Sequence, residues 1–373
     1  MVLPMRILLY KLLIHNQCYR GKGFFGHQKT RKIEKIGEVF MELGKIPPEI
    51  LNKIVLDPIE KGSVKRKDVV IRPRTGEDCS AVFLGDELCV LSTDPITGAE
   101  KDMGYIAVHI NCNDIASSGA EPIGILLTVL LPPKSTEETL EDVMSGAYRA
   151  AKELGIEILG GHTEVTAVVN KPLISAAVIG KTRNKKFVST GGAKVGQDVL
   201  MTKWAGLEGT AIIAKDYEEE LKNSLSDEVI RIAQNMQGFL SVVKESKIAL
   251  EHGVDAMHDA TEGGVLGAVW EMAECSGLGV ELYLDRIPVK NETSLICEAA
   301  GIDPYGLISS GTLIISCFNG DSLVKKLQKE GIESAVIGKI TKKDKKIYEN
   351  SLVKTLEQPK SDALYRVKFN KVL

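Results

Sequence analysis

Paired cysteines, long apolar runs and a basic excess are all missing from this sequence. The seven cysteines are widely spaced and form no Cys-x-x-Cys motif, which argues against a disulfide framework or a zinc ribbon and predicts a reducing, cytoplasmic location. No apolar stretch approaches the length needed to span a bilayer. The formal net charge is -3, whereas a protein that mainly coats nucleic acid is usually basic. We therefore expect neither a membrane nor a nucleic-acid partner.

The motifs of several common enzyme classes are also absent. Gly180-Lys181-Thr182 resembles the end of a P-loop, but Ser175 occupies the position of its first glycine. The sequence has no kinase glycine-rich loop, no Gly-x-Ser-x-Gly elbow and no His-Glu-x-x-His pair. These absences argue against a P-loop enzyme, a protein kinase, a serine hydrolase and a catalytic zinc site.

The first 40 residues differ in charge from the rest of the chain. They contain eight Lys or Arg and only two acidic residues. The apolar run Ile7–Ile14 leads to no small-residue cleavage site, and the stretch has no serine, so neither a signal peptide nor a transit peptide is expected. We expect residues 1–40 to be a basic extension outside the fold, and Met41 to open the first domain. The alternative is a genuine disordered basic arm.

The rest of the chain alternates between predicted strands and helices, which indicates an α/β fold. The clearest helix follows Pro132-Pro133, with Ser135 as its cap, Glu138 completing a capping box and Gly155 at its end. Further helices are expected over 104–118, 226–253 with a break at Gly238, and 265–276. The predicted strands are Val69–Arg72, Cys79–Leu84, Leu88–Ser92, Ile123–Leu131, Leu173–Gly180, Asp198–Thr202, Gly279–Leu284 and Gly311–Cys317.

A polar stretch rich in Lys, Gly and Thr, Lys181–Val195, marks a predicted domain boundary. We therefore expect an N-terminal domain over 41–182 and a C-terminal domain over 183–345. The charged segment 346–373 is predicted to be a loosely packed tail.

Several carboxylates stand beside glycines or small residues at the ends of predicted elements. Such carboxylates from separate segments suit Mg²⁺, which prefers oxygen ligands. Glycine pairs at helix starts let backbone N–H groups approach phosphate. The combination indicates Mg-nucleotide chemistry, although any one of these residues alone reads better as a turn former or helix cap. The carboxylates are Asp78, Asp94, Asp114, Glu164 and Asp259.

Two histidines are considered for chemistry. His162 is the better candidate because it lies in a Gly-Gly segment beside Thr163 and Glu164. His109 is interpreted equally well as a helix-packing residue and as a substrate contact. The cysteines in apolar strands, such as Cys317, are expected to be buried and inert.

Five motifs in one order resemble the aminoimidazole ribonucleotide (AIR) synthetase superfamily. They are Gly76-Glu77-Asp78, Ser92-Thr93-Asp94, Asn113-Asp114-Ile115-Ala116, Gly160-Gly161-His162-Thr163-Glu164-Val165 and Asp259-Ala260-Thr261-Glu262-Gly263-Gly264. The similarity runs over about residues 41–339. Within the superfamily, which includes thiamine-monophosphate kinase and selenophosphate synthetase, the sequence is most similar to the hydrogenase-maturation protein HypE and its relatives.

The resemblance implies a two-domain α/β fold. The N-terminal domain would contribute strands to a barrel shared across a homodimer, and the C-terminal domain would pack helices on a mixed sheet. ATP and Mg²⁺ would bind near the dimer interface and serve to phosphorylate an amide or carbonyl oxygen.

The resemblance also implies roles for individual residues. Mg²⁺ would be held by Asp78, Asp94 and Asp114, and His162 and Asp259 would be catalytic. The nucleotide would be bound by Asn113, Gly160, Gly161, Thr163, Glu164, Thr261, Gly263 and Gly264.

The sequence departs from HypE at places that bear on its chemistry. HypE typically has Asp-Thr-Lys where this chain has His162-Thr163-Glu164. HypE also carries a carbamoyl group on a terminal cysteine, whereas residues 318–373 of this chain contain no cysteine. We therefore expect an enzyme that activates an amide of a free small molecule or of another protein, with a maturation protein as a possible partner. The alternatives are a catalytically silent nucleotide-binding partner in a maturation complex and a small-molecule kinase.

Overall fold

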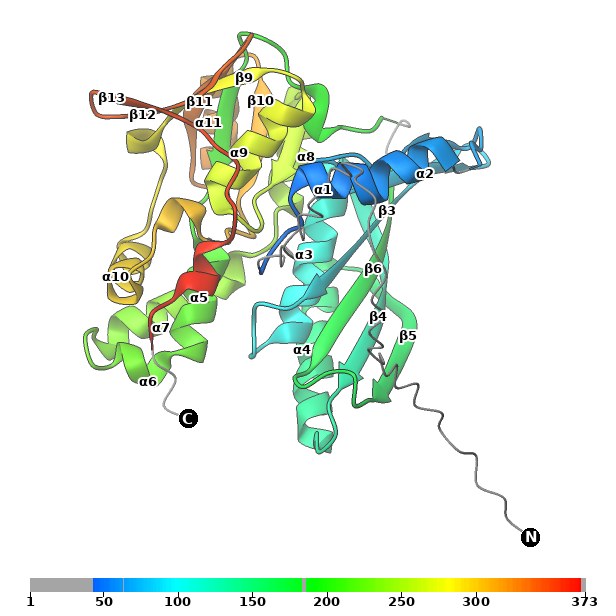
Figure 1. Cartoon of the computed structure of the whole chain (residues 1–373), viewed down its shortest axis with the longest axis vertical. Coiled ribbons are helices and arrows are strands. Elements are labelled where there is room, and N and C mark those ends of the chain that lie inside the picture. The colour runs from blue at the N-terminus through cyan, green and yellow to red at the C-terminus, as the bar shows by residue number, and fades with distance from the viewer. Residues whose placement is uncertain (1–42, 63, 183–185, 370–373) are drawn as a thin grey trace, which may run out of the picture. The chain divides into compact units, whose positions relative to one another are not determined.

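The computed structural model describes residues 43–62, 64–182 and 186–369 (Figure 1). The basic extension expected over 1–40 lies outside the described residues. No helix among the described residues combines the length and apolar character needed to cross a membrane. The described strands form two sheets, one in each half of the chain.

The first sheet has six strands in the order β1-β2-β3-β6-β4-β5. Neighbouring strands are antiparallel except β4 and β5, which are parallel because α4 connects them. Glu157–Val165 (β5) therefore forms one edge of this sheet. The other strands are β1 (Val69–Ile71), β2 (Ser80–Leu84), β3 (Glu87–Ile96), β4 (Ala120–Leu131) and β6 (Leu173–Thr182).

Two helices cover one face of the first sheet (Figure 1). All residues of α3 (Met103–Ser117) are buried, because this helix contacts the sheet, α4, α8 and β8. Helix α4 (Glu137–Leu154) buries a narrow stripe that includes Val143 and Ala147. The predicted cap at Ser135 is wrong, because Thr136 is the N-cap and forms its capping box with Thr139.

The opposite face of the first sheet is open in one chain. Ile125, Leu127 and Val129 of β4 are buried beneath the helices, whereas Ile123 and Leu126 are exposed. In the single chain β4 is therefore buried on one face only, because successive side chains of a strand alternate between faces. The exposed apolar side chains leave a surface that a second molecule could cover.

The second sheet has seven strands in the order β13-β12-β9-β11-β7-β10-β8. It is mixed, as predicted, because β12 runs parallel to β9 while the other pairs are antiparallel. The strands are β7 (Asp198–Thr202), β8 (Ala256–Asp259), β9 (Gly279–Tyr283), β10 (Leu313–Cys317), β11 (Ser334–Thr341), β12 (Lys345–Glu349) and β13 (Leu352–Thr355).

Helices cover both faces of the second sheet. Val199 and Met201 of β7 pack in the core beneath α9 (Gly264–Cys275), and Leu200 packs in the opposite core beneath α8 (Val243–His252) and α11 (Gly320–Lys329). The remaining helices are α1 (Pro48–Leu51), α2 (Asp57–Gly62), α5 (Leu207–Asp216), α6 (Glu218–Leu221), α7 (Asp227–Asn235) and α10 (Asn291–Ala300).

The charged C-terminal segment is integrated into the fold. Strands β12 and β13 extend the second sheet, and the side chain of Asp362 is buried among backbone N–H groups. The expectation of loose packing is therefore wrong for the described part of this segment, because its backbone pairs with β9. The predicted domain boundaries at 182 and 345 stay predictions.

Candidate active site

Four aspartates from separate elements lie close enough to shift one another's ionisation. Asp94 lies on β3, Asp114 on α3 and Asp259 at the end of β8, while Asp78 precedes β2. Helix α3 contacts β3 and β8, and this packing brings Asp114 towards Asp259. The structure thus brings together the three predicted Mg²⁺ ligands and one of the two predicted catalytic residues.

The electrostatics of these aspartates favour a bound cation. Burial and then the charges of Asp78 and Asp259 raise the pKa of Asp94 to about 7. Burial and the charge of Asp78 likewise raise the pKa of Asp259 to about 6, and burial raises the pKa of Asp114 well above its ordinary value. Repulsion between neighbouring carboxylates contributes to each of these pKa shifts, and a bound divalent cation would relieve that repulsion.

Asp259 has unsatisfied oxygens. Its side chain is 1% exposed, and neither carboxylate oxygen has a hydrogen-bond partner among the described residues. Asp114 is equally buried, and its Oδ2 accepts a 2.6 Å hydrogen bond from Ser92 Oγ. An orphaned buried carboxylate is costly, and oxygen ligation of a hard cation satisfies it. These residues therefore fit Mg²⁺.

A histidine that the sequence analysis left out organises the cluster. His258 is buried, with Nε2 2.9 Å from Glu271 Oε2 and Nδ1 3.2 Å from Asp78 Oδ2. Burial would lower the pKa of His258, but the two carboxylates raise it well above its ordinary value. Conversely, burial would raise the pKa of Asp78, but His258 lowers it to about 2. Ligand atoms of Asp78, His258 and Asp259 lie within 4.8 Å of one another, yet a protonated imidazole cannot ligate a metal, so the carboxylates are the candidate ligands.

A cavity of about 530 Å³ opens beside the cluster. Asp94, Thr261 and Glu262 line it on the side of the aspartates, and Lys45 supplies the only positive charge among the described residues that line it. Lys45 Nζ lies 3.3 Å from Glu271 Oε1. The volume suits a small organic ligand or part of a nucleotide.

Two family models match this chain. "AIR synthase related protein, N-terminal domain" matches residues 76–182, and "AIR synthase related protein, C-terminal domain" matches residues 194–349. The chain belongs to the AIR synthase related family. It is a member of the PurM-like superfamily that lies close to HypE.

Similar curated proteins point the same way. A putative hydrogenase expression/formation protein of Methanocaldococcus jannaschii is 27% identical over 341 residues, which cover 87% of this chain and 97% of the relative. The carbamoyl dehydratase HypE of Bradyrhizobium diazoefficiens is 29% identical over 253 residues, which cover 64% of this chain and 69% of that protein.

Solved structures share the fold of this family member. A HypE chain in a HypE-HypF complex superposes with a TM-score of 0.67 at 22% identity, covering 82% of this chain and 100% of that one. A HypE crystallised with ATP superposes with a TM-score of 0.61 at 20% identity, covering 87% and 98%. The expected two-domain α/β fold is therefore confirmed.

The predicted Gly-Gly segment of this AIR synthase related chain lies away from the aspartates. Gly160, Gly161, His162, Thr163 and Glu164 belong to the edge strand β5, where His162 Nε2 lies 3.2 Å from Glu164 Oε2 and both side chains are exposed. Strands β6 and β4 separate β5 from β3, a displacement of about 14 Å at ordinary strand spacing. One chain alone therefore does not bring His162 to the candidate metal site.

Close packing accounts for one of these glycines. A Cβ at Gly161, whose φ is +147°, would stand 1.8 Å from the carbonyl oxygen of Leu127. Any other residue would push β5 away from β4. Close packing of the two strands thus explains the glycine at position 161 without a bound phosphate.

The backbone N–H groups of the second predicted glycine pair are also hydrogen-bonded within the chain. The N–H of Gly263 donates to Asp362 Oδ2 at 2.7 Å, and the N–H of Gly264 donates to the carbonyl of Thr261 at 3.0 Å. These two N–H groups are therefore engaged within the chain, and their predicted part in nucleotide binding stays a prediction.

Asn113 has an internal role as well. Its Nδ2 donates to the carbonyl of Leu240 at 2.7 Å, and its Oδ1 accepts from the N–H of Val242 at 2.9 Å. These bonds tie α3 to the second half of the chain. Its predicted contact with the nucleotide stays a prediction.

Sequence reasoning missed several residues around the site: Lys45, Glu208, His258, Glu271 and Asp362. The one sequence signal for His258 was its position directly before the Asp259 motif. The others lie outside every motif and reach the site only through tertiary packing.

Proposed function

We propose that this chain is an ATP- and Mg²⁺-dependent enzyme that transfers a phosphoryl group to an amide or carbonyl oxygen. The observation that carries the proposal is the buried, unsatisfied carboxylate of Asp259 among three further aspartates, beside a cavity of about 530 Å³. The relatives named carbamoyl dehydratase and the HypE structure with ATP support it.

The aspartates would hold the metal. Asp78, Asp94, Asp114 and Asp259 supply oxygen ligands, and Mg²⁺ would neutralise charge on the phosphates and favour phosphoryl transfer. His258 holds Asp78 ionised and in place through its contact at 3.2 Å. Asp259 is better suited to ligation than to proton transfer, because no other group of the described chain satisfies its oxygens.

A second copy of the chain would complete the site. The open edge of β5 carries exposed Leu159 and Val165, and the neighbouring face exposes Leu126. Covering this face with a partner molecule removes apolar surface and an unpaired strand edge from water. We propose that a homodimer forms here and that its partner strand brings His162, Thr163 and Glu164 to the nucleotide.

The likeness to HypE also suggests a source for the substrate. A HypE protein has been crystallised with HypF. We propose that the present chain receives its amide substrate from a maturation partner protein.

The fate of labelled γ-phosphate tests the function. The pure protein should release labelled phosphate from Mg-ATP in the presence of an amide acceptor. Asp259→Asn should lose this activity, whereas Glu298→Gln, which changes an exposed glutamate on α10, should retain it. A stable phosphorylated product would instead identify a small-molecule kinase. Nucleotide binding without turnover across a panel of amides would identify a silent partner protein.

A further inference from the structure

A second cavity, of about 710 Å³, lies at the other end of β10 from the aspartates. Leu313 of β10 pairs with Asp259, whereas Cys317 pairs with Asp198, which lines this cavity. At an ordinary rise per residue, Leu313 and Cys317 are about 13 Å apart along the strand. The cavity is therefore separate from the candidate active site. Its walls come from β7, α8, the turn after β10, α11 and β11.

An exposed aromatic ring borders this cavity. Phe318 directly follows β10, whose residues are all buried, yet Phe318 is 53% exposed. The next residue, Asn319, has a φ of +58° and leads the chain from β10 into α11. A large ring that stands in water beside a cavity offers a flat apolar surface on which a planar ligand can stack.

Three polar side chains that line the same cavity have unused hydrogen-bonding capacity. Lys325 forms no hydrogen bond or ion pair with any described residue. Asn319 is the N-cap of α11, but its side chain makes no capping hydrogen bond. The Nδ1 atom of His252 is shielded from solvent and has no partner among the residues that the structure describes. A polar ligand could bond to all three side chains without breaking a contact of the fold.

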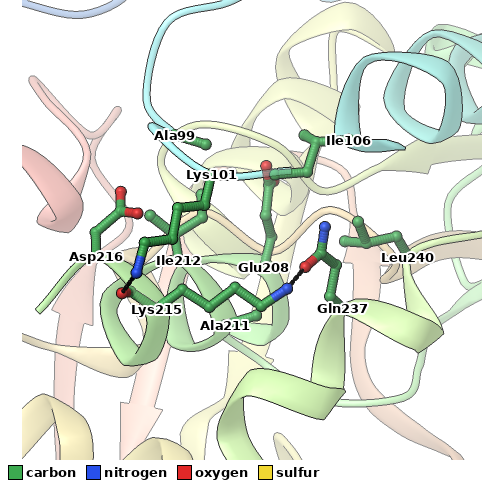
Figure 2. A pocket seen from close by; sticks show the side chains of 10 residues that line it. All are labelled: Ala99, Lys101, Ile106, Glu208, Ala211, Ile212, Lys215, Asp216, Gln237 and Leu240. Atoms are coloured by element: carbon green, nitrogen blue, oxygen red, sulfur yellow. Dashed lines mark hydrogen bonds between the residues drawn. The ribbon is translucent and has the colours of Figure 1, made fainter. Parts of the chain in front are cut away.

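Two lysines that border the candidate active site are, in contrast, held within the chain. Figure 2 shows Lys101 and Lys215 beside Glu208. Lys101 Nζ donates to the carbonyl of Lys215 at 2.7 Å, and Lys215 Nζ lies 2.6 Å from Asp102 Oδ2 and also contacts Gln237. An anion would have to displace these contacts to bind either lysine, whereas Lys325 is available in the second cavity.

The charges of the second cavity narrow the chemistry of its ligand. Asp198 is already paired, because its Oδ2 accepts from the N–H of Gly320 at 3.0 Å and its Oδ1 lies 3.5 Å from Lys339 Nζ. Asp321, in the first turn of α11, is a hydrogen-bond acceptor when ionised. A ligand that meets Asp321 must therefore present donors such as hydroxyl groups. The lining as a whole favours a molecule with a planar ring, hydroxyl groups and an anionic group.

We propose that this cavity is a second nucleotide site, which binds a nucleoside monophosphate without a metal ion. The base stacks on Phe318, the phosphate pairs with Lys325 and Lys339, and the ribose hydroxyls donate to Asp321. The volume of about 710 Å³ lies within the range of small-molecule sites. The proposal is independent of the proposed function, because it uses none of the residues around the aspartate cluster.

Three probes separate the parts of the ligand: adenosine monophosphate (AMP), adenosine, which lacks the phosphate, and ribose 5-phosphate, which lacks the base. Each is titrated calorimetrically into the full chain with a chelator present, so that no Mg²⁺ occupies the aspartates. AMP should bind about tenfold more tightly than either fragment, because only AMP makes both the stacking contact and the lysine contacts. Equal affinities of the three probes, or no binding of AMP at millimolar concentration, would overturn the proposal.

Variants assign the binding to this cavity. Phe318→Ala and Lys325→Met should each weaken AMP binding about tenfold. Both side chains are exposed, so neither change should disturb the fold. The matched controls are Phe239→Ala, at a ring that is 50% exposed elsewhere, and Lys329→Met, at the other end of α11. Both controls should bind AMP as wild type does. Undiminished AMP binding in both Phe318→Ala and Lys325→Met would refute the assignment.

A variant of the aspartate cluster separates the two nucleotide sites. Asp259→Asn should bind AMP as wild type does, with its folding checked by circular dichroism. Loss of AMP binding in a folded Asp259→Asn protein would place AMP at the aspartates and contradict the second site. Unchanged AMP affinity in Asp259→Asn, together with weakened binding in Phe318→Ala, would support it.

Discussion

The carboxylate of Asp362 accepts a 2.7 Å hydrogen bond from the backbone N–H of Gly263, although 99 positions separate the two residues. The same carboxylate accepts from the N–H groups of Ile308 and Leu364, at 3.2 and 2.7 Å. A residue beyond the matched family domains thus fixes the turn that begins α9, directly after the Asp259 strand.

We predict that Asp362→Ala destabilises the protein. The change leaves N–H groups without an acceptor in a buried place, which should lower the free energy of unfolding by about 3 kcal/mol. Asp362→Asn, which keeps one acceptor, should cost less. Urea denaturation measures both, with the exposed Glu357→Ala as the control. A loss for Asp362→Ala no larger than for the control would refute this anchoring role.

We predict that Leu126→Asp dissociates the proposed homodimer. Leu126 is 41% exposed on the open face of the first sheet, and a carboxylate there would be desolvated in an interface. The dissociation constant should rise about tenfold or more. Ile232→Asp is the control, since Ile232 is 37% exposed on α7. Light scattering at micromolar concentration should find a dimer for wild type and the control and a monomer for Leu126→Asp. A wild-type monomer would contradict the proposed interface.

We predict that His109 makes the protein sensitive to acid. His109 is buried between α3 and α4, and burial lowers its pKa to about 4, although Glu153 lies 3.5 Å away and opposes the shift. The unfolded chain therefore binds a proton at higher pH than the folded one does. The contribution of neutral His109 to the free energy of unfolding is complete above about pH 6.5. It falls by about 3 kcal/mol as the pH drops to about 4.

His109→Gln tests this, because glutamine does not titrate. The free energy of unfolding of the variant should fall less between pH 7 and pH 4 than that of wild type, as measured by urea denaturation. Identical pH dependence in the two proteins would assign the acid sensitivity to other groups.

Part of the fold could be predicted because its elements carry their own periodic signal. The predicted strand Asp198–Thr202 coincides with β7, and the helix predicted over 104–118 matches α3 within one residue at each end. The local apolar residues were enough to predict these two elements, because both segments are buried in the fold.

Other elements depend on tertiary contacts that no local pattern reports. Strand β5 holds two glycines and polar residues, so its sequence predicted no strand, whereas it is an edge strand paired with β4. Strand β8 is four residues long and includes His258 and Asp259, and its burial comes from packing against α3 and α9.

The residues of the candidate site could likewise be predicted only in part. The ordered motifs located the aspartates, and the structure brings them together. Helix α3 is buried on every side, and Asp114 is buried with it. His258, Lys45 and Glu208 could not be found, since the residues that they contact are distant in sequence.

Calorimetric titration of Mg-ATP into wild type, Asp114→Asn, Asp259→Asn and the control Glu298→Gln tests the central claim most directly. We predict binding to wild type and the control, a loss of affinity of about tenfold or more in both aspartate variants, and unchanged folding of all four proteins by circular dichroism. Mg-ATP affinity that is equal in wild type and both aspartate variants would contradict the assignment of these carboxylates as the metal-nucleotide site.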